Sequence, residues 1–214
     1  DHHGGAHTSS ITKIDSNEFG IDAKEIADIN AQMQAAVDGG FIAGNILLVG
    51  NSEGVGVLET TGTHGPEQST PMDEQTLFRI YSMTKPIVSV ATMTLVEDGL
   101  LAISDPVSKY IPEFANMTVI NEETGAITPA ANEMTVQDLL THESGLIYGI
   151  FDPQSELGKM YFQAGSLRSD ITALTLAQNL AALPLRFEPG TKWNYSRSTD
   201  VLGAVIEVAA GKPL

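Results

Sequence analysis

The chain has 214 residues, of which 42% are hydrophobic and 18% are charged, the composition of an ordinary globular protein. Asp and Glu total 27 against 11 Lys and Arg, and the resulting net charge of −16 argues against nucleic-acid binding and adhesion to anionic membrane surfaces. The absence of cysteine excludes a disulfide, a thiolate zinc site and a cysteine nucleophile, and no apolar run reaches the roughly 18–20 residues that a membrane span needs.

The first 20 residues are polar and aperiodic, which predicts a flexible arm. Its histidines His2, His3 and His7 could form a metal-binding tract, but no partner ligands follow them, so a flexible terminus or part of a purification tag is the favoured interpretation. The chain begins with Asp1, so we expect its start to be a processing site or an artificial boundary. No metal and no cofactor is expected.

Residues 21–81 are predicted to form the N-terminal part of an α/β sheet domain. Apolar residues recur with the three- and four-residue spacing of an amphipathic helix over residues 21–38. The β-rich runs 45–51 and 55–60 flank a turn and indicate a hairpin, and residues 77–81 are a further strand candidate. This order favours a thin sheet with a helix on one face.

Residues 82–214 are predicted to form a helical domain. The expected helices, recognised by apolar spacing, capping residues and terminal glycines, are 85–98, 106–110, 135–141, 171–182 and 199–210. The first is apolar nearly all round, which is typical of a helix buried in a domain centre. The stretches 116–134 and 146–170 are expected to be loops, so every strand candidate lies before Ser82.

Ser52 lies in a motif with the G-x-S-x-G spacing of a nucleophile elbow, Gly50-Asn51-Ser52-Glu53-Gly54. In that motif the serine lies on a strained turn from a strand into a helix. Ser52 instead falls between two predicted strands, with no helix after it. A plain hairpin turn is therefore the favoured interpretation.

The S-x-x-K motif occurs twice, at Ser10 and Lys13 and at Ser82 and Lys85. Ser10 lies in the predicted arm, whereas Ser82 opens the most apolar helix. Residues i and i+3 share a helix face with Cβ atoms about 5–6 Å apart, so the Lys85 amine can reach the Ser82 hydroxyl. A serine hydroxyl becomes a good nucleophile when such a base accepts its proton.

The start of this helix would assist the same chemistry. Burial and the positive helix end should both lower the pKa of Lys85, and the Ser82 N–H, which lacks an intrahelical partner, can help to form an oxyanion hole. The alternative is a serine that caps the helix and a lysine that extends into solvent.

Several segments, in order along the chain, resemble the serine β-lactamase-like hydrolases, which include class C β-lactamases, DD-peptidases and family VIII carboxylesterases. These segments are residues 77–86, 97–101, 104–107, 110–112, 135–146, 187–191 and 195–196. The resemblance runs over residues 21–214 and implies an α/β (α+β) β-lactamase/transpeptidase-like fold. It implies a partial fold, with the N-terminal helix, the hairpin and the helical domain present and the remaining strands missing from this chain.

The resemblance implies that Ser82 is the nucleophile, Lys85 its partner and Tyr195 a general base. A phenol acts as a base when cations lower its pKa from about 10, and Lys85 and Arg197 could supply them. The alternative for Tyr195 is an aromatic that packs between two helices.

The sequence also departs from the family pattern. Class C enzymes carry Tyr-x-Asn, whereas this chain has Tyr195-Ser196-Arg197, which is more similar to the esterase branch, and no K-T-G-like strand motif follows. His142 could belong to a Ser-His-Asp triad with Ser82 or Ser52, but the resemblance places it in a structural stretch.

We therefore expect a serine hydrolase that forms a covalent acyl-enzyme, most similar to a family VIII carboxylesterase on small esters. The alternatives are a β-lactamase or DD-peptidase and, from another class, a non-catalytic penicillin-binding-like fragment or scaffold. The expected partners are a small-molecule ester or amide substrate and the C-terminal half of the fold as a second chain. Without that half we expect little activity.

Overall fold

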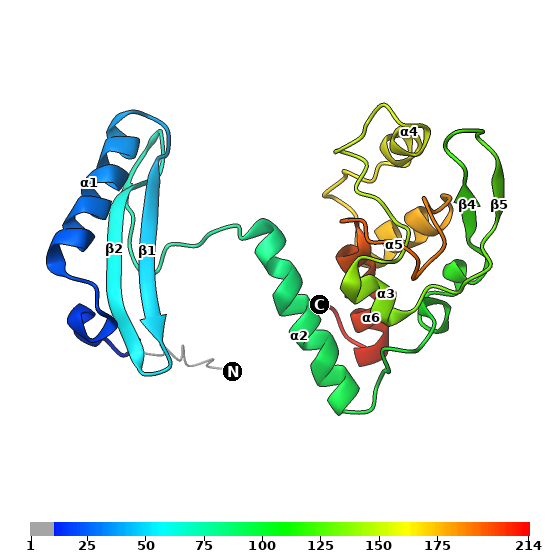
Figure 1. Ribbon diagram of the computed structural model, residues 1–214, viewed down its shortest axis with the longest axis horizontal. Helices are drawn as coiled ribbons and strands as arrows, with labels where there is room; N and C mark the ends of the chain where they lie inside the picture. The colour runs from blue at the N-terminus through cyan, green and yellow to red at the C-terminus, as the bar shows by residue number, and fades with distance from the viewer. Residues whose placement is uncertain (1–10) are drawn as a thin grey trace, which may run out of the picture. The chain divides into compact units, whose positions relative to one another are not determined.

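In the computed structural model, which describes residues 11–214, the chain divides into two units, residues 11–79 and residues 80–214 (Figure 1). Each unit is described by itself. Within the described range, none of the helices is both long and apolar enough to cross a membrane.

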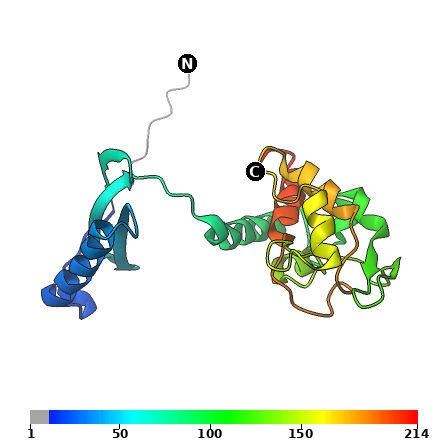
Figure 2. The same ribbon diagram turned by 90° about the horizontal axis from the view of Figure 1, so that it is seen from above.

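Unit 1 is a three-stranded antiparallel sheet with one long helix. The strands β1 (Gly44–Asn51), β2 (Gly54–Gly65) and β3 (Gln68–Pro71) pair in the order β1-β2-β3. The helix α1 (Ala23–Asp38) packs along β2 in both views (Figures 1 and 2). It begins at a capping box in which Asp22 and Glu25 each accept the other's backbone N–H. The predicted helix and hairpin are thus confirmed.

The prediction of a strand at residues 77–81 is wrong. Residues 77–80 pair with no strand of the described chain, and Tyr81 opens the 3₁₀ helix η2 (Tyr81–Met83). A strand forms only where a neighbour takes up its backbone hydrogen bonds. That neighbour is available to β3, which the sequence analysis missed because its four residues show no apolar alternation.

Part of the expected arm is ordered on unit 1. Lys13 bridges to Val55 of β2, and the 3₁₀ helix η1 (Ser16–Phe19) begins at Asp15, whose carboxylate accepts the N–H of Asn17. The remainder of the predicted arm, with its histidine tract, lies outside the described residues.

Unit 2 is built around α6 (Ser198–Ala210), in which every residue from Val201 to Ile206 is buried. The helices α2 (Thr84–Glu97), α3 (Val136–Thr141) and α5 (Ala173–Ala181) pack against it. The main hydrophobic core of the described chain lies wholly in this unit. The predicted helices 85–98, 135–141, 171–182 and 199–210 are therefore confirmed, because capping and apolar spacing point to the same boundaries.

The regions expected to be loops contain further structure. A small hairpin, β4 (Thr118–Ile120) and β5 (Ile127–Pro129), lies in 116–134, and α4 (Glu156–Gln163) lies in 146–170. The prediction that every strand precedes Ser82 is therefore wrong, because three-residue strands leave too short a pattern to detect.

The expected helix at 106–110 is reduced to the 3₁₀ helix η3 (Val107–Lys109), followed by η4 (Pro112–Asn116). Asp105, which with Ser104 is the cap expected from the sequence, does not cap this helix. Its carboxylate accepts instead from the N–H of Ala102 and the hydroxyl of Tyr110, which lowers the pKa of Asp105 to about 2, with the Tyr110 bond as the largest cause.

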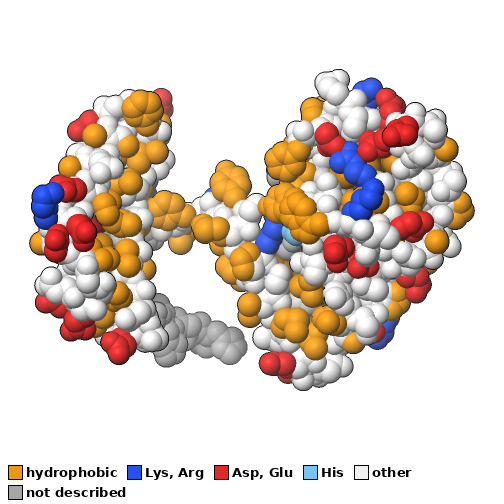
Figure 3. All heavy atoms as spheres, in the orientation of Figure 1, with side chains coloured by type: hydrophobic (Ala, Val, Ile, Leu, Met, Phe, Trp, Pro, Cys, Tyr) orange, Lys and Arg blue, Asp and Glu red, His pale blue; other side chains and the backbone are white. Residues whose placement is uncertain are grey.

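The helix expected at 85–98, which is α2, is not buried on all sides as predicted. Its face toward α6 carries the buried Val88 and Thr92, whereas Ile87, Val90 and Met93 are 60%, 64% and 45% exposed. Figure 3 shows hydrophobic side chains at the surface where α2 lies. Within unit 2, α6 covers one face of α2, so the opposite face is exposed in this unit.

Candidate active site

Ser82 lies in η2, immediately before α2, and its side chain is exposed. The preceding residue, Tyr81, has φ +46°, in the left-handed region that non-glycine residues seldom adopt. Such a conformation costs on the order of 1–3 kcal/mol and persists only where the surrounding structure imposes it. The backbone is therefore strained directly before the expected nucleophile.

Three predicted residues meet at the Ser82 hydroxyl. The Tyr195 hydroxyl donates to Ser82 Oγ at 2.7 Å, and Lys85 Nζ donates to the same oxygen at 3.3 Å. Lys85 lies in the first turn of α2, three residues after Ser82, whereas Tyr195 lies just before α6. The structure thus brings together two residues close in sequence and one that is 113 residues away.

The electrostatics of this cluster differ from the expectation for the lysine. Burial lowers the pKa of Lys85, but its interactions with the hydroxyls of Tyr195 and Tyr148 raise it, and the net pKa is above the ordinary value. The predicted lowering was wrong because it counted burial and the helix end but not the two phenols.

The pKa of Tyr195 is shifted in the opposite direction. The interaction with the Lys85 ammonium is the largest cause, followed by the hydrogen bond with Ser82, and both lower the pKa of Tyr195 below the usual value near 10. Lys85 Nζ also lies 4.7 Å from the centre of the Tyr195 ring. The cluster therefore favours a phenolate beside an ammonium over a neutral lysine beside a phenol.

Tyr148 is a component of the cluster that the sequence analysis missed. Lys85 Nζ donates to its hydroxyl at 3.3 Å, and its ring stacks on Tyr195 at 5.3 Å between centroids and 20° between planes. Tyr148 falls two residues after the segment 135–146, in a stretch expected to be a loop. The signal for it was its position directly after a family-like segment.

Arg197, considered as a second cation for Tyr195, is found over a different ring. Its guanidinium carbon lies 4.8 Å from the centre of the Tyr148 ring, and Nη1 is 3.5 Å from Asp200 Oδ2. Lys85 is the cation that lowers the pKa of Tyr195.

His142 supports the segment that carries Tyr195. Its Nδ1 accepts the backbone N–H of Ser196 at 3.2 Å, which assigns the ring proton to Nε2, and its carbonyl accepts the N–H of Asn194. Burial, and then the charge of Lys85, lower its pKa and favour the neutral ring. The hydrogen bonds of His142 thus lead to Ser196 and not to Ser82, which leaves the triad interpretation without a contact.

Ser52 lies in the β1–β2 turn, where Asn51 Oδ1 accepts the N–H groups of Glu53 and Gly54. A strand and not a helix follows, so the requirement of a nucleophile elbow is not met.

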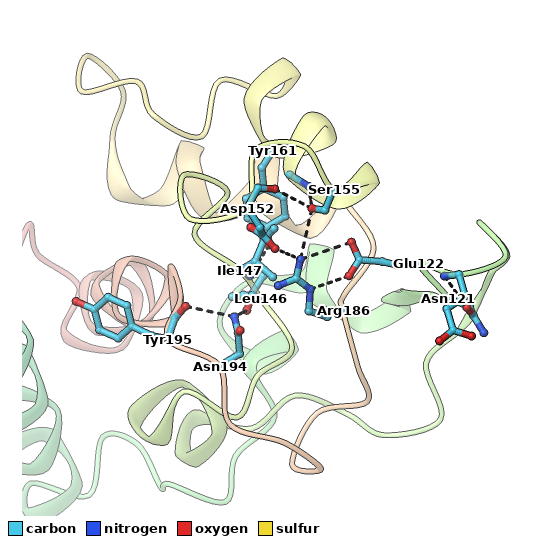
Figure 4. A network of polar contacts seen from close by, with 12 residues as sticks. Asn121, Glu122, Leu146, Ile147, Asp152, Ser155, Tyr161, Arg186, Asn194 and Tyr195 are labelled. Carbon is cyan, nitrogen blue, oxygen red and sulfur yellow. Dashed lines mark hydrogen bonds and ion pairs between the residues drawn. The ribbon is translucent and has the colours of Figure 1, made fainter.

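A polar network holds the loop that carries Tyr148 (Figure 4). Arg186 donates from Nε to Glu122 at 2.9 Å and from Nη2 to Asp152. At the other end of the loop, the Ile147 N–H donates to the hydroxyl of the fully buried Tyr161. The loop is therefore fixed on both sides of Tyr148.

Asn194 ties this loop to the segment of Tyr195. Its Nδ2 donates to the carbonyls of Leu146 and Tyr195 at 3.3 and 3.2 Å (Figure 4). The two stacked tyrosines consequently come from segments that are hydrogen-bonded to each other.

Ser82 lines a pocket of about 530 Å³ within unit 2. Polar side chains on its wall include Lys85, Tyr148, Arg197 and Asp200, and apolar ones include Ile171 and Leu176. In the part of the chain that the structure describes, no cluster of three or more His, Asp or Glu side chains could hold a metal ion.

The chain is similar in sequence to several known proteins. Esterase EstB of Burkholderia gladioli is 35% identical over 210 residues, which cover 96% of this chain and 51% of EstB. Protein Rv1367c of Mycobacterium tuberculosis is 33% identical over 187 residues, covering 86% of this chain and 46% of its own length.

Among solved structures, EstCE1, "a hydrolase with promiscuous acyltransferase activity", matches with a TM-score of 0.73 and 31% identity over 89% of this chain and 48% of EstCE1. The chain therefore spans about half the length of the relatives it matches. Its residues 29–214 match the family model described as Beta-lactamase, and the chain belongs to the β-lactamase family.

Proposed function

We propose that this protein is a serine hydrolase that cleaves small carboxylic esters through an acyl-enzyme on Ser82. The observation that supports this most directly is the 2.7 Å hydrogen bond from Tyr195 to Ser82 Oγ, beside a lysine that lowers the pKa of that phenol. The similarity to EstB and EstCE1 supports an ester as substrate.

In the proposed reaction, Ser82 Oγ attacks the ester carbonyl carbon while its proton passes to the Tyr195 phenolate. The Lys85 ammonium stabilises that phenolate, and the Ser82 N–H, in the first turn of its helix, donates to the developing oxyanion. Tyr195 then protonates the departing alcohol. A water molecule, deprotonated by Tyr195, attacks the acyl carbon, and Tyr195 returns that proton to Ser82 Oγ as the bond between this oxygen and the acyl group breaks and the carboxylic acid leaves.

We further propose that full activity requires the part of the fold that this chain does not span, as a continuation or a second chain. The observation behind it is that the matched relatives are about twice as long. The family resemblance implies that the strand with the K-T-G-like motif donates a second N–H to the oxyanion, and loss of that donor alone would lower the rate by about 10²- to 10³-fold. Equal kcat values for these 214 residues and for a protein of the relatives' length would contradict this requirement.

Acyl transfer to an alcohol is a second candidate, because EstCE1 combines hydrolase and acyltransferase activity. It uses the same acyl-enzyme and differs only in the acceptor. Product analysis in the presence of a short-chain alcohol separates the two: transfer yields a new ester, whereas hydrolysis yields the free acid.

The experiment compares the turnover of a short-chain p-nitrophenyl ester with that of a chromogenic cephalosporin. It uses wild type, Ser82→Ala and the matched control Ser52→Ala, each in a protein of the relatives' length. We expect faster turnover of the ester, loss of activity in Ser82→Ala and retention in Ser52→Ala. Preference for the cephalosporin would place the protein among the β-lactamases. Activity that survives in Ser82→Ala and disappears in Ser52→Ala would refute the assignment of the nucleophile, and no turnover of either compound would favour a non-catalytic scaffold.

A further inference from the structure

Arg197 is a charged side chain in the pocket of Ser82 for which the proposed reaction has no role. Its side chain is only 15% exposed, although it lies on the wall of the pocket that also exposes Ser82 and Lys85. A molecule bound at Ser82 would therefore meet the guanidinium.

The donors of this guanidinium are largely unused. Within residues 11–214, Nε is buried without a hydrogen-bond partner and is out of reach of a ligand in the pocket, and the terminal Nη1 has an ion pair of 3.5 Å with Asp200. Charge-assisted hydrogen bonds are typically about 2.7–2.9 Å, and a guanidinium offers five N–H donors. Burial of a charge without such partners is costly, so the terminal nitrogens Nη1 and Nη2 have capacity for an acceptor that the described chain does not supply.

The surroundings distinguish Arg197 from the other arginine on the pocket wall. Arg168 donates Nε and Nη2 to Asp170 at 2.8 and 2.7 Å, so a carboxylate of the chain already occupies one bidentate edge of its guanidinium. The ring of Tyr148 lies against Arg197, 4.8 Å from the guanidinium carbon. A cation this close to an aromatic ring is attracted to it, so the Tyr148 ring helps to hold the guanidinium at the pocket wall.

We infer that Arg197 binds a carboxylate of the substrate, so that the preferred esters are acidic. The inference rests on the proposed function, since it names the substrate class for Ser82. A carboxylate can accept two parallel N–H···O bonds from a guanidinium, whereas a neutral chain would leave the donors unpaired. Because the chain carries a net charge of −16, selection of an anionic ester requires a local cation of this kind.

The test measures kcat/KM for two pairs of esters, using a protein of the relatives' length. One pair carries the carboxylate on the acyl side, the p-nitrophenyl monoester of glutaric acid against its neutral methyl diester. The other carries it on the alcohol side, 4-acetoxybenzoate against its methyl ester. We expect wild type to prefer the acid of at least one pair and Arg197→Gln to reduce that acid-to-neutral ratio about 10- to 100-fold.

Two further variants separate recognition from damage to the site. Arg197→Lys should recover part of the ratio, because it keeps the charge but not the planar fork, and the matched control Arg168→Gln should keep most of it. The inference is overturned if the acid-to-neutral ratio of kcat/KM is the same in wild type and Arg197→Gln for both pairs. It is also overturned if Arg168→Gln lowers this ratio as much as Arg197→Gln does. If neutral esters still react at Ser82 in that case, the proposed function stands, whereas absence of Ser82-dependent turnover of any ester refutes the function itself.

Discussion

Tyr195 is the residue on which the proposed chemistry most depends, because its hydroxyl contacts the nucleophile and its pKa is lowered by Lys85. Tyr195→Phe should reduce kcat by about 10²- to 10⁴-fold, the usual contribution of a general base, with a smaller change in KM. The matched control is Tyr148→Phe, which keeps the stacked ring and loses only the hydroxyl near Lys85. Steady-state kinetics on one ester measure both. Equal losses in the two variants would contradict a special role for Tyr195.

The pH dependence of the reaction follows from the lowered pKa of Tyr195 and the raised pKa of Lys85. The active pair is a Tyr195 phenolate and a Lys85 ammonium, so kcat/KM should rise with pH as Tyr195 loses its proton, at a pKa below about 10. It should fall again only where Lys85 deprotonates, since its pKa is raised. A pH–rate profile from about 6 to 11 measures both limbs. A rate already at its maximum near pH 7 would instead indicate a base such as His142, whose pKa is lowered.

For individual side chains, the sequence predicted contacts within one helix turn, but it was less informative about contacts between residues far apart in the chain. Ser82 and Lys85 follow from i,i+3 spacing, whereas Tyr195 required the family resemblance, since no local pattern links positions 113 apart. Tyr148 and the raised pKa of Lys85 depend on side-chain distances that arise only when the loop after α3 folds back.

Among the elements, the loop between α3 and α4 depends on Arg186 for its position. Arg186→Met would leave Asp152 and Glu122 without their shared cation and should lower the free energy of unfolding by about 1–2 kcal/mol, a modest value because the Arg186 side chain is 24% exposed. Because the same loop carries Tyr148, kcat should fall as well.

Chemical denaturation and steady-state kinetics measure these two effects of Arg186→Met. The matched control is Arg168→Met, whose ion pair with Asp170 lies at the surface and should contribute little. Equal effects of the two substitutions would show that the Arg186 network does not hold the loop.

The helices of unit 2 were predictable where a cap and an apolar period agree, as in α3, where Thr135 and Asp138 form a capping box. The hairpin β4–β5 and the helix α4 were not, because short elements contain too few residues to show a period. The wrong strand at 77–81 has the apolar composition of a strand, but no neighbouring strand in the described chain pairs with it.

Across the whole molecule, burial is distributed unevenly between the units. The large apolar core lies in unit 2, whereas Val57 and Met72 are the buried apolar residues of unit 1 within the described range. Backbone amides of α6 should therefore exchange with deuterium far more slowly than those of β1 and β2. Hydrogen exchange followed by mass spectrometry measures this. Equal protection of β2 and α6 would show that unit 1 has a stabilising partner surface.

The central claim, that Ser82 is the acylated nucleophile activated by Tyr195, is tested most directly by mass spectrometry after brief incubation with a p-nitrophenyl phosphonate. The account predicts one covalent adduct, mapped to the peptide that contains Ser82, absent in Ser82→Ala and formed much more slowly in Tyr195→Phe. An adduct on Ser52, or equal labelling rates in wild type and Tyr195→Phe, would contradict it.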